Sequence, residues 1–359
     1  MKGRVLVAGF ATRHVAQSAF RAGYEVCAVD HFCDQDLAWY TRDRLQFEDL
    51  ADLPGAIDTM AKRHSFDLFV TTSGAEDLPT ALPLCGTSPE NVARFLDKLE
   101  IQHFFEETGV PVPRIVPDGT YPAMIKPRRG AGGWRNGVIR SGAERHEWEL
   151  QNPDMPFILQ ELVPGIPASV SCIADGRRAR AVAVNEQLLR GDQARGTYGF
   201  CGSVTPFSHP AAARMAAIAE KVAGQSGCTG SLGVDFMVNG EDVWTIEINP
   251  RFQGTVDTVE RATGCSLFQY HVDACSGVLP APVPTPQKVS VRSILFADRD
   301  MTVKKDLGAL APAVADIPWP GTFFEQDQAI VSVFGEGPTR EDALAVLDKH
   351  IRSVLQYIR

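Results

Sequence analysis

Residues 233–251 read Gly-Val-Asp-Phe-Met-Val-Asn-Gly-Glu-Asp-Val-Trp-Thr-Ile-Glu-Ile-Asn-Pro-Arg. This stretch carries the strongest local pattern in the chain. Apolar and polar residues alternate on both sides of Asn239-Gly240, a dipeptide that favours a tight hairpin turn. The sequence therefore predicts two antiparallel strands joined by a short loop.

Three oxygen-bearing side chains make this hairpin a candidate metal site. Glu247 and Asn249 are two positions apart, so they project from the same face of their strand. Asp235 joins that face if the loop has an odd number of residues, whereas a two- or four-residue loop turns it to the other face. Such oxygens suit Mg²⁺ or Mn²⁺ shared with phosphate groups. The alternative is a strand face of solvated acids, but the alternation with Ile246 and Ile248 favours the metal site.

A glycine-rich loop follows a second predicted strand. Residues 123–137 read Ala-Met-Ile-Lys-Pro-Arg-Arg-Gly-Ala-Gly-Gly-Trp-Arg-Asn-Gly, so the strand ends at Lys126. A lysine supplies a compact charge, and glycine amides can approach phosphate oxygens closely. The Walker pattern is absent, and the alternative interpretation is a mobile surface turn.

Two further segments carry weaker signals. Asp97-Lys98 lies on a predicted helix over residues 88–107, and such a pair alone is typical of a surface. Residues 157–165 read Phe-Ile-Leu-Gln-Glu-Leu-Val-Pro-Gly, which by itself indicates a core strand that ends in a turn.

The beginning of the chain predicts a parallel sheet with crossover helices. Apolar runs at residues 4–9, 24–30 and 68–72 read as strands, with a helical pattern between the first two. Asp30 lies 21 positions after Gly9, where a dinucleotide-binding fold places its ribose-binding acid. The second and third glycines of that fingerprint are missing, so NAD binding is disfavoured.

The remaining elements follow from periodicity. We expect short strands at 123–126, 137–140 and 157–162, antiparallel strands within 169–185 and 229–249, a helix at 211–226, a proline-rich linker at 279–286, strands at 289–297 and 329–334, and a final helix at 339–358.

Composition narrows the class of partner. The 359 residues, with 44% hydrophobic and 22% charged, predict a globular chain of two or three domains. A net charge of -9 argues against nucleic acid or an anionic membrane and favours a small molecule. Eight cysteines without a Cys-x-x-Cys pair indicate free thiols. The sequence has no apolar stretch long enough for a signal peptide or a membrane span, so we expect a cytoplasmic protein.

Taken in order, these segments resemble the ATP-grasp superfamily over most of residues 86–264. The runs Gly9-Phe-Ala-Thr-Arg13 and Asn249-Pro-Arg-Phe-Gln-Gly254 are similar to predicted ATP-dependent carboligases of the carbamoyl-phosphate-synthase and biotin-carboxylase type. The resemblance implies an α/β chain: a Rossmann-like domain at 1–90, an ATP-grasp domain at 91–280 with a lid at about 115–162, and a small α+β domain at 287–359.

The resemblance also implies a role for each candidate residue. Lys98 and Lys126 would hold the ATP phosphates, and Arg251 would clamp the substrate carboxylate or the acyl phosphate by a bidentate fork, which makes Lys126 and Arg251 the catalytic candidates. The remaining assignments are a closing loop with Gly130, Gly132 and Gly133, an adenine pocket lined by Gln160, Glu161, Leu162 and Val163, and a Mg²⁺ site of Asp235, Glu247 and Asn249. Residues 166–169 lack the acid that the family places near the ribose, so that contact is unassigned.

The activity expected from this resemblance is that of an ATP-dependent carboxylate–amine ligase that forms an acyl phosphate. Alternatives are an N-carboxylating enzyme that uses bicarbonate through carboxyphosphate, and a non-catalytic ATP sensor, against which the intact metal ligands argue. The acid and the amine are left open. Residues on segments that could edge their pocket are Arg13, Glu76, Arg195 and Arg292. The oligomeric state is also open, with a homodimer the commonest arrangement.

Overall fold

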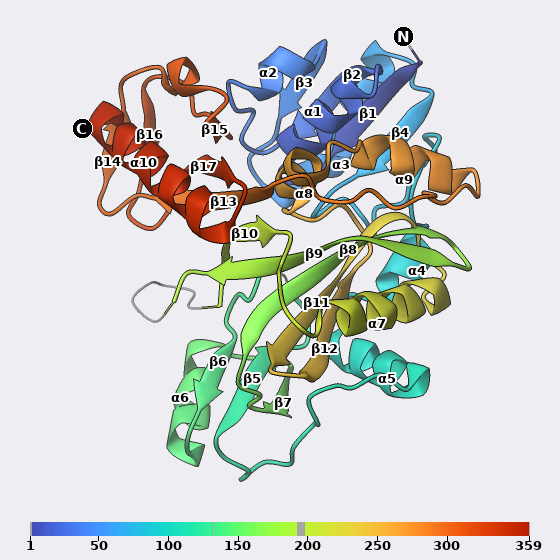
Figure 1. The fold of residues 1–359 in the computed structure, drawn as a ribbon, viewed down its shortest axis with the longest axis vertical. Coiled ribbons are helices and arrows are strands. Elements are labelled where there is room, and N and C mark those ends of the chain that lie inside the picture. The colour runs from blue at the N-terminus through green and yellow to red at the C-terminus, as the bar shows by residue number, and fades with distance from the viewer. Residues whose placement is uncertain (1, 131, 192–197, 359) are drawn as a thin grey trace.

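The computed structural model describes residues 2–130, 132–191 and 198–358, so the predicted pocket residue Arg195 lies outside the described residues. Figure 1 shows the N-terminal sheet at one end and a small sheet at the other. A long sheet fills the middle, and its C-terminal strands lie beside the N-terminal sheet. This mixed arrangement confirms the predicted α/β class.

The N-terminal region is a parallel sheet with helices on both faces. Its strand order is β3-β2-β1-β4. Alternate residues of β1 enter two different cores: Val5 packs with the side chains of α1, and Leu6 packs with those of α3. The elements are β1 (Arg4–Ala8), α1 (Arg13–Arg21), β2 (Glu25–Asp30), α2 (Leu37–Tyr40), β3 (Asp43–Gln46), a 3₁₀ turn (Leu50–Asp52), α3 (Leu53–Arg63) and β4 (Leu68–Thr71).

At the end of this sheet, Gly9 and Asp30 each have a structural role in contacts within the chain. A Cβ on Gly9 would lie 2.1 Å from Oγ1 of Thr72, so the glycine lets two segments approach closely. The Asp30 carboxylate accepts hydrogen bonds from the backbone and hydroxyl of Thr12 and from the backbone N–H groups of Phe32 and Cys33. Asp30 therefore holds the loops at the edge of the sheet together.

The predicted continuous helix over residues 88–107 is wrong. The chain forms two helices, α4 (Pro89–Ala93) and α5 (Lys98–Thr108). They are separated because Asp97 is extended and its side chain accepts a hydrogen bond from the backbone N–H of Leu99, which caps α5. Lys98 is therefore the first residue of a helix rather than a residue in the middle of one.

The small sheet has the predicted short strands in the order β6-β5-β7, all antiparallel. Its core includes Ile125, Ile139 and Leu159, with Trp148 packed against them. The elements are β5 (Ala123–Pro127), β6 (Gly137–Ile139), α6 (Gly142–Gln151) and β7 (Phe157–Glu161).

The long sheet has eight strands in the order β12-β11-β8-β9-β10-β13-β17-β15. β10, which the sequence analysis did not predict, pairs with β13 and so joins the C-terminal strands to the central ones. The domain boundaries at residues 90 and 287 stay a prediction. The strands are β8 (Ile166–Asp175), β9 (Ala179–Leu189), β10 (Phe200–Thr205), β11 (Thr229–Asn239), β12 (Asp242–Asn249), β13 (Val289–Phe296), β15 (Val314–Ala315) and β17 (Ala329–Gly337).

The remaining helices cover this sheet (Figure 1). The elements are α7 (Ala212–Gln225), α8 (Val256–Thr263), α9 (Leu267–Cys275), a ribbon of β14 (Met301–Val303) and β16 (Thr322–Phe324), a 3₁₀ turn (Leu307–Leu310) and α10 (Arg340–Ile358). The eight cysteines are free thiols, as predicted. Within the described ranges, no helix combines the length and the apolar character needed to cross a membrane.

Candidate active site

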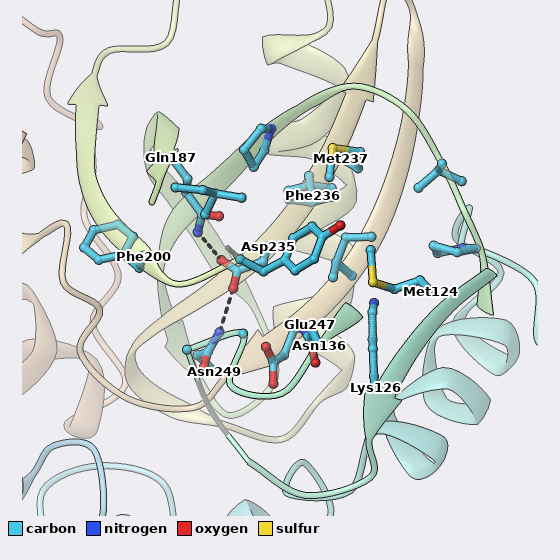
Figure 2. Close-up of a pocket in the computed structure, with 18 of the residues that line it drawn as sticks. Met124, Lys126, Asn136, Gln187, Phe200, Asp235, Phe236, Met237, Glu247 and Asn249 are labelled. Carbon is cyan, nitrogen blue, oxygen red and sulfur yellow. Dashed lines mark hydrogen bonds between the residues drawn. The ribbon is translucent and has the colours of Figure 1, made fainter. Parts of the chain in front are cut away.

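A cavity of about 290 Å³ lies between the small sheet and the β11–β12 end of the long sheet. Most of the predicted site residues line it: Lys126, Gly132, Gly133, Gln160, Glu161, Leu162, Val163, Asp235, Glu247, Asn249 and Arg251. Lys98 and Gly130 are not among the lining residues but lie beside them, as described below. Figure 2 shows this cavity, with Asp235 between Gln187 and Asn249 and with Lys126 on β5.

A β-bulge decides which way Asp235 points. Asn239 pairs with Asp242, so the hairpin loop has two residues, and by parity alone Asp235 would oppose Ile246 and face away from Glu247. The register shifts by one between Asp235 and Phe236, and Asp235 pairs with Glu247 instead. The two carboxylates therefore share one face despite the even loop.

The donor set on this face suits a divalent cation. The Asp235 carboxylate accepts hydrogen bonds from Nε2 of Gln187 at 2.9 Å and from Nδ2 of Asn249 at 3.1 Å. Burial, and after it the nearby Glu247 carboxylate, raise the pKa of Asp235 to about 7, and Arg251 opposes this rise. Two facing carboxylates and an amide oxygen are ligands that Mg²⁺ accepts, and a cation would relieve their repulsion. These residues therefore fit the predicted metal, although their role as ligands stays a prediction.

Gly233 gives Gln253 its access to this site. Nε2 of Gln253 lies 3.3 Å from Oδ1 of Asp235, and a Cβ on Gly233 would lie 1.7 Å from the same amide. We expect Gly233→Ala to lower the free energy of unfolding by about 1–3 kcal/mol, the usual cost of overpacking a filled site. Denaturant unfolding of the full chain measures this change.

Two further variants test the cause of that loss. The double variant Gly233→Ala/Gln253→Ala removes the overlapping side chain and should recover most of the lost stability. Gly55→Ala is the control, because a Cβ at that glycine meets no atom within 4 Å. A double variant that is no more stable than Gly233→Ala would contradict the explanation.

Two lysines and the glycine loop meet at this cavity. Lys126 on β5 is buried, and no carboxylate of the described residues lies within ion-pair distance of its Nζ. Burial lowers the pKa of Lys126 to about 8; Glu247 opposes this decrease, and Lys98 adds to it. Nζ of Lys98 donates to the carbonyl of Gly130 at 2.7 Å and lies 3.6 Å from Oε1 of Glu247. A buried ammonium group of this kind suits a polyphosphate ligand.

The glycine loop keeps its backbone close to a neighbouring segment. Gly133 has a φ of +71°, which favours glycine. A Cβ at this position would lie 2.3 Å from the carbonyl oxygen of Tyr198. The loop therefore requires glycine for its conformation and for its packing.

The cavity also has apolar lining residues, which suit a flat base. Residues that line it are Met124, Leu162, Val163, Met237 and Ile246. The carboxylate of Glu161 binds Nε of Arg114 at 2.8 Å, and the side chain of Gln160 donates to Oε1 of Gln102 at 2.8 Å. Glu161 is therefore engaged by Arg114, whereas Oε1 of Gln160 is buried without a hydrogen-bond partner among the described residues. The role of this segment in an adenine pocket stays a prediction.

Arg251 joins the face that carries Asp235, Glu247 and Asn249 to the N-terminal region. Its Nε donates to Oε1 of Glu76 at 2.9 Å, and its Nη2 donates to Oδ1 of Asn249 at 3.1 Å. Glu76 lines neither of the two cavities described here but orients Arg251. The predicted edge residues Arg13 and Arg292 lie in the second cavity, described below.

Several residues of the site were not predicted from the sequence. The missed residues include Asn136, Gln187, Phe200 and Gln253. Gln253 lies inside the 249–254 run that carried the resemblance, so that run could have indicated it. Gln187 and Phe200 reach the site through strand pairing far along the chain, which leaves no local signal.

Cys85, His271 and Cys275 also cluster, within 4.8 Å of one another, but do not form a metal site. Nδ1 of His271 accepts a hydrogen bond from the backbone N–H of Ser231, so its Nε2 donates to the carbonyl of Cys85. Both ring nitrogens are therefore occupied. The imidazole of His271 therefore links α9 to β11.

Residues 95–255 match the family model of an ATP-grasp domain. The carbamoyl phosphate synthase large chain of Myxococcus xanthus is 25% identical over 288 residues, which cover 72% of this chain and 26% of that protein. The same protein of Thermus thermophilus is also 25% identical, with 28% of its length covered. This chain thus spans about a quarter of the length of the curated relatives that it matches.

Solved structures share the fold over nearly the whole chain. The biotin carboxylase domain of the Hydrogenobacter thermophilus 2-oxoglutarate carboxylase, solved with MgADP, ADP and bicarbonate, has a TM-score of 0.79 at 14% identity, covering 99% of this chain and 90% of that one. N5-carboxyaminoimidazole ribonucleotide synthetase from Thermus thermophilus has a TM-score of 0.71 at 19% identity, covering 99% and 98%.

Proposed function

Since this chain carries an ATP-grasp domain, as its sequence predicted, we propose that it is an ATP-dependent carboxylate–amine ligase. The observation that carries the proposal is the placement of Asp235, Glu247 and Asn249 on one face, opposite the buried Lys126. Arg251 lies where this cavity meets a second one, so phosphate chemistry and a second substrate can adjoin.

The reaction has two steps in this proposal. An oxygen of the substrate carboxylate attacks the γ-phosphorus of ATP, the bond to the bridging oxygen breaks, and ADP leaves. The amine nitrogen then attacks the acyl carbon, inorganic phosphate leaves, and the nitrogen loses a proton. No side-chain nucleophile is required, because phosphoryl transfer depends mainly on positioning and on charge stabilisation.

The candidate residues have the following roles in these steps. Lys126 and Lys98 hold the phosphate oxygens, and the glycine loop offers backbone N–H groups to them. Mg²⁺ held by Asp235, Glu247 and Asn249 would neutralise the charge that develops on the phosphates. The guanidinium of Arg251, oriented by Glu76, holds the attacking carboxylate in line.

We expect ADP release to require both an organic acid and an amine. The test screens acid and amine pairs with Mg-ATP and identifies the product by mass spectrometry. A productive pair should raise ADP release above the ATP-only rate by about a hundredfold or more, the scale on which positioning a substrate contributes. The control is the same mixture without the amine, which should give no amide product.

Two other results of the screen would contradict the proposal. ADP release that needs bicarbonate and no organic acid would favour N-carboxylation through carboxyphosphate. ATP binding by calorimetry with no ADP release for any pair would favour a sensor.

A further inference from the structure

A second cavity, of about 690 Å³, lies between the end of the N-terminal sheet and the C-terminal strands. It shares Phe200, Arg251 and Gly254 with the first cavity, so the two adjoin at the proposed carboxylate clamp. Its volume is in the range of small-molecule sites. The chemistry of its walls indicates what it can bind.

Aromatic rings form much of the wall. Phe10 stacks on His31 with centroids 4.5 Å apart, and Phe32 meets Phe10 edge-on at 5.2 Å. Trp319 and Phe323, from the C-terminal region, also line this cavity. Phe10, Phe32, Trp319 and Phe323 are 37%, 42%, 44% and 57% exposed, respectively. Large rings exposed around one cavity indicate a ligand with a flat or broad apolar group.

Most charged groups of this cavity are already paired. Asp316 binds Nε of Arg13 at 2.8 Å and Nη2 of Arg292 at 2.9 Å. Arg13 also forms a buried ion pair with Asp257 at 2.7 Å. These pairs hold the N-terminal region, α8 and β13 together. They leave neither arginine free to neutralise another acid.

Among the described residues, two lining acids lack both an ion pair and a hydrogen bond: Glu48, which is exposed, and Asp34, which is partly buried. In the described parts of the chain, the Asp34 carboxylate accepts no hydrogen bond, and no cationic group lies within ion-pair distance of it. Burial raises the pKa of Asp34 well above its usual range; Asp316, Asp36 and Asp30 add to this rise, and Arg13 opposes it. An acid in such surroundings is stabilised by a cation from outside the chain.

The backbone holds Asp34 next to the aromatic wall. The N–H of Gln35 donates to the carbonyl of Ile317 at 2.7 Å, and Nε1 of Trp319 donates to the carbonyl of Cys33 at 3.0 Å. These bonds join the two residues that flank Asp34 to the segment that carries Trp319. The acid and the rings are therefore parts of one preformed wall.

We propose that this second cavity binds the amine substrate as an organic ammonium ion with an aromatic or similarly broad apolar group. The bound ammonium gives up one proton, to the Asp34 carboxylate or to solvent, before its nitrogen attacks the acyl carbon. Asp34 is the counter-ion, and Phe10, Phe32 and Trp319 are the walls. Aromatic faces attract cations, and a carboxylate adds a charge-assisted hydrogen bond, so the two features select the same ligand. The assignment of this ligand as a substrate rests on the proposed ligase function.

Calorimetry on the full chain tests the site with four probes. They are 2-phenylethylamine, the alcohol 2-phenylethanol, the acid 3-phenylpropionate, and n-butylamine, which keeps the charge without the ring. We expect 2-phenylethylamine to bind at least about tenfold more tightly than the alcohol and the acid, since one charged hydrogen bond contributes that much. It should also bind at least about tenfold more tightly than n-butylamine, because n-butylamine lacks the aromatic ring and the apolar surface that the ring buries.

Variants of the wall locate the binding. Asp34→Asn should weaken 2-phenylethylamine about tenfold to a hundredfold, and Trp319→Leu should weaken it about threefold to tenfold. Asp58→Asn is the matched control, because it removes an acid from an exposed position on α3 that lines neither cavity. Asp34→Asn should also melt no lower than the unmodified chain, because it removes an unpaired, partly buried acid.

Some outcomes would overturn this site. They are binding of the alcohol as tightly as the amine, no binding of any probe, or equal binding by Asp34→Asn and Asp58→Asn. Failure of the ligase proposal is distinguishable. If amine binding depends on Asp34 but no acid and amine pair gives ADP release, the binding site is supported and the ligase proposal is contradicted. If the chain is a ligase but its KM for the amine is unchanged in Asp34→Asn, only the proposed binding site is contradicted.

Discussion

The variant Glu247→Gln is expected to lower amide formation by at least about a hundredfold, the scale on which one strong electrostatic stabiliser contributes to catalysis. Glu247 pairs with Asp235 at the bulge, and its Oε1 lies 3.6 Å from Nζ of Lys98. Its charge therefore interacts with the proposed metal site and with a lysine. Glutamine keeps the shape of the side chain and removes only the charge. The assay is the rate of product formation with the acid and amine found by the screen.

The control for this variant lies on the same hairpin. Glu241→Gln removes a carboxylate from the exposed turn between β11 and β12 and should leave the rate unchanged. Melting curves of both variants show whether the fold is kept. A Glu247→Gln variant that works at the unmodified rate in saturating Mg²⁺ would contradict the assignment of Glu247 as a metal ligand.

The hairpin shows how far the sequence could predict the site. Alternation and Asn239-Gly240 predicted both strands, and the spacing of Glu247 and Asn249 placed them on one face. The orientation of Asp235 was left open, because parity depends on the loop and on any bulge. The bulge at Asp235 and Phe236 decided it, and this shift has no marker in the residue pattern.

Elements that depend on distant pairing were the hardest to predict. β10 was not predicted because Gly202 and Ser203 weaken its strand pattern. Its stability comes from pairing with β9 and β13. The helix break at Asp97 was also missed, since an aspartate within an apolar stripe reads as a surface residue until its capping bond is known.

The second cavity could not be predicted for the same reason. Its walls come mainly from residues 10–48 and 316–332, which lie far apart in the sequence and are brought together where the C-terminal strands extend the central sheet. A single sequence shows Asp34 and Trp319 as two unrelated residues. Their function depends on hydrogen bonds such as the one from Trp319 to Cys33.

Substitutions of Lys126 and Arg251 should separate ATP binding from chemistry. Lys126 is buried beside the glycine loop, so Lys126→Ala should weaken ATP binding by about tenfold to a hundredfold, the loss of one strong charged contact. Arg251 lies between the two cavities, so Arg251→Ala should leave ATP affinity within about threefold and lower amide formation at least about a hundredfold through misplacement of the carboxylate. Calorimetry with ATP and the turnover assay, run on the same preparations, measure the two effects.

Arg251→Ala also leaves the Glu76 carboxylate, 2.9 Å from Nε of Arg251, without its partner, and this could lower activity through the fold alone. The double variant Arg251→Ala/Glu76→Ala removes that acid, so it should recover thermal stability but not turnover. Arg251→Lys keeps the charge and loses the fork, and should remain at least about tenfold slower than the unmodified chain, because a point charge does not fix a carboxylate in line. Full turnover in Arg251→Lys would show that charge alone suffices. Unchanged substrate-dependent ADP release in Arg251→Ala would place the carboxylate elsewhere and leave Arg251 a structural link between Asn249 and Glu76.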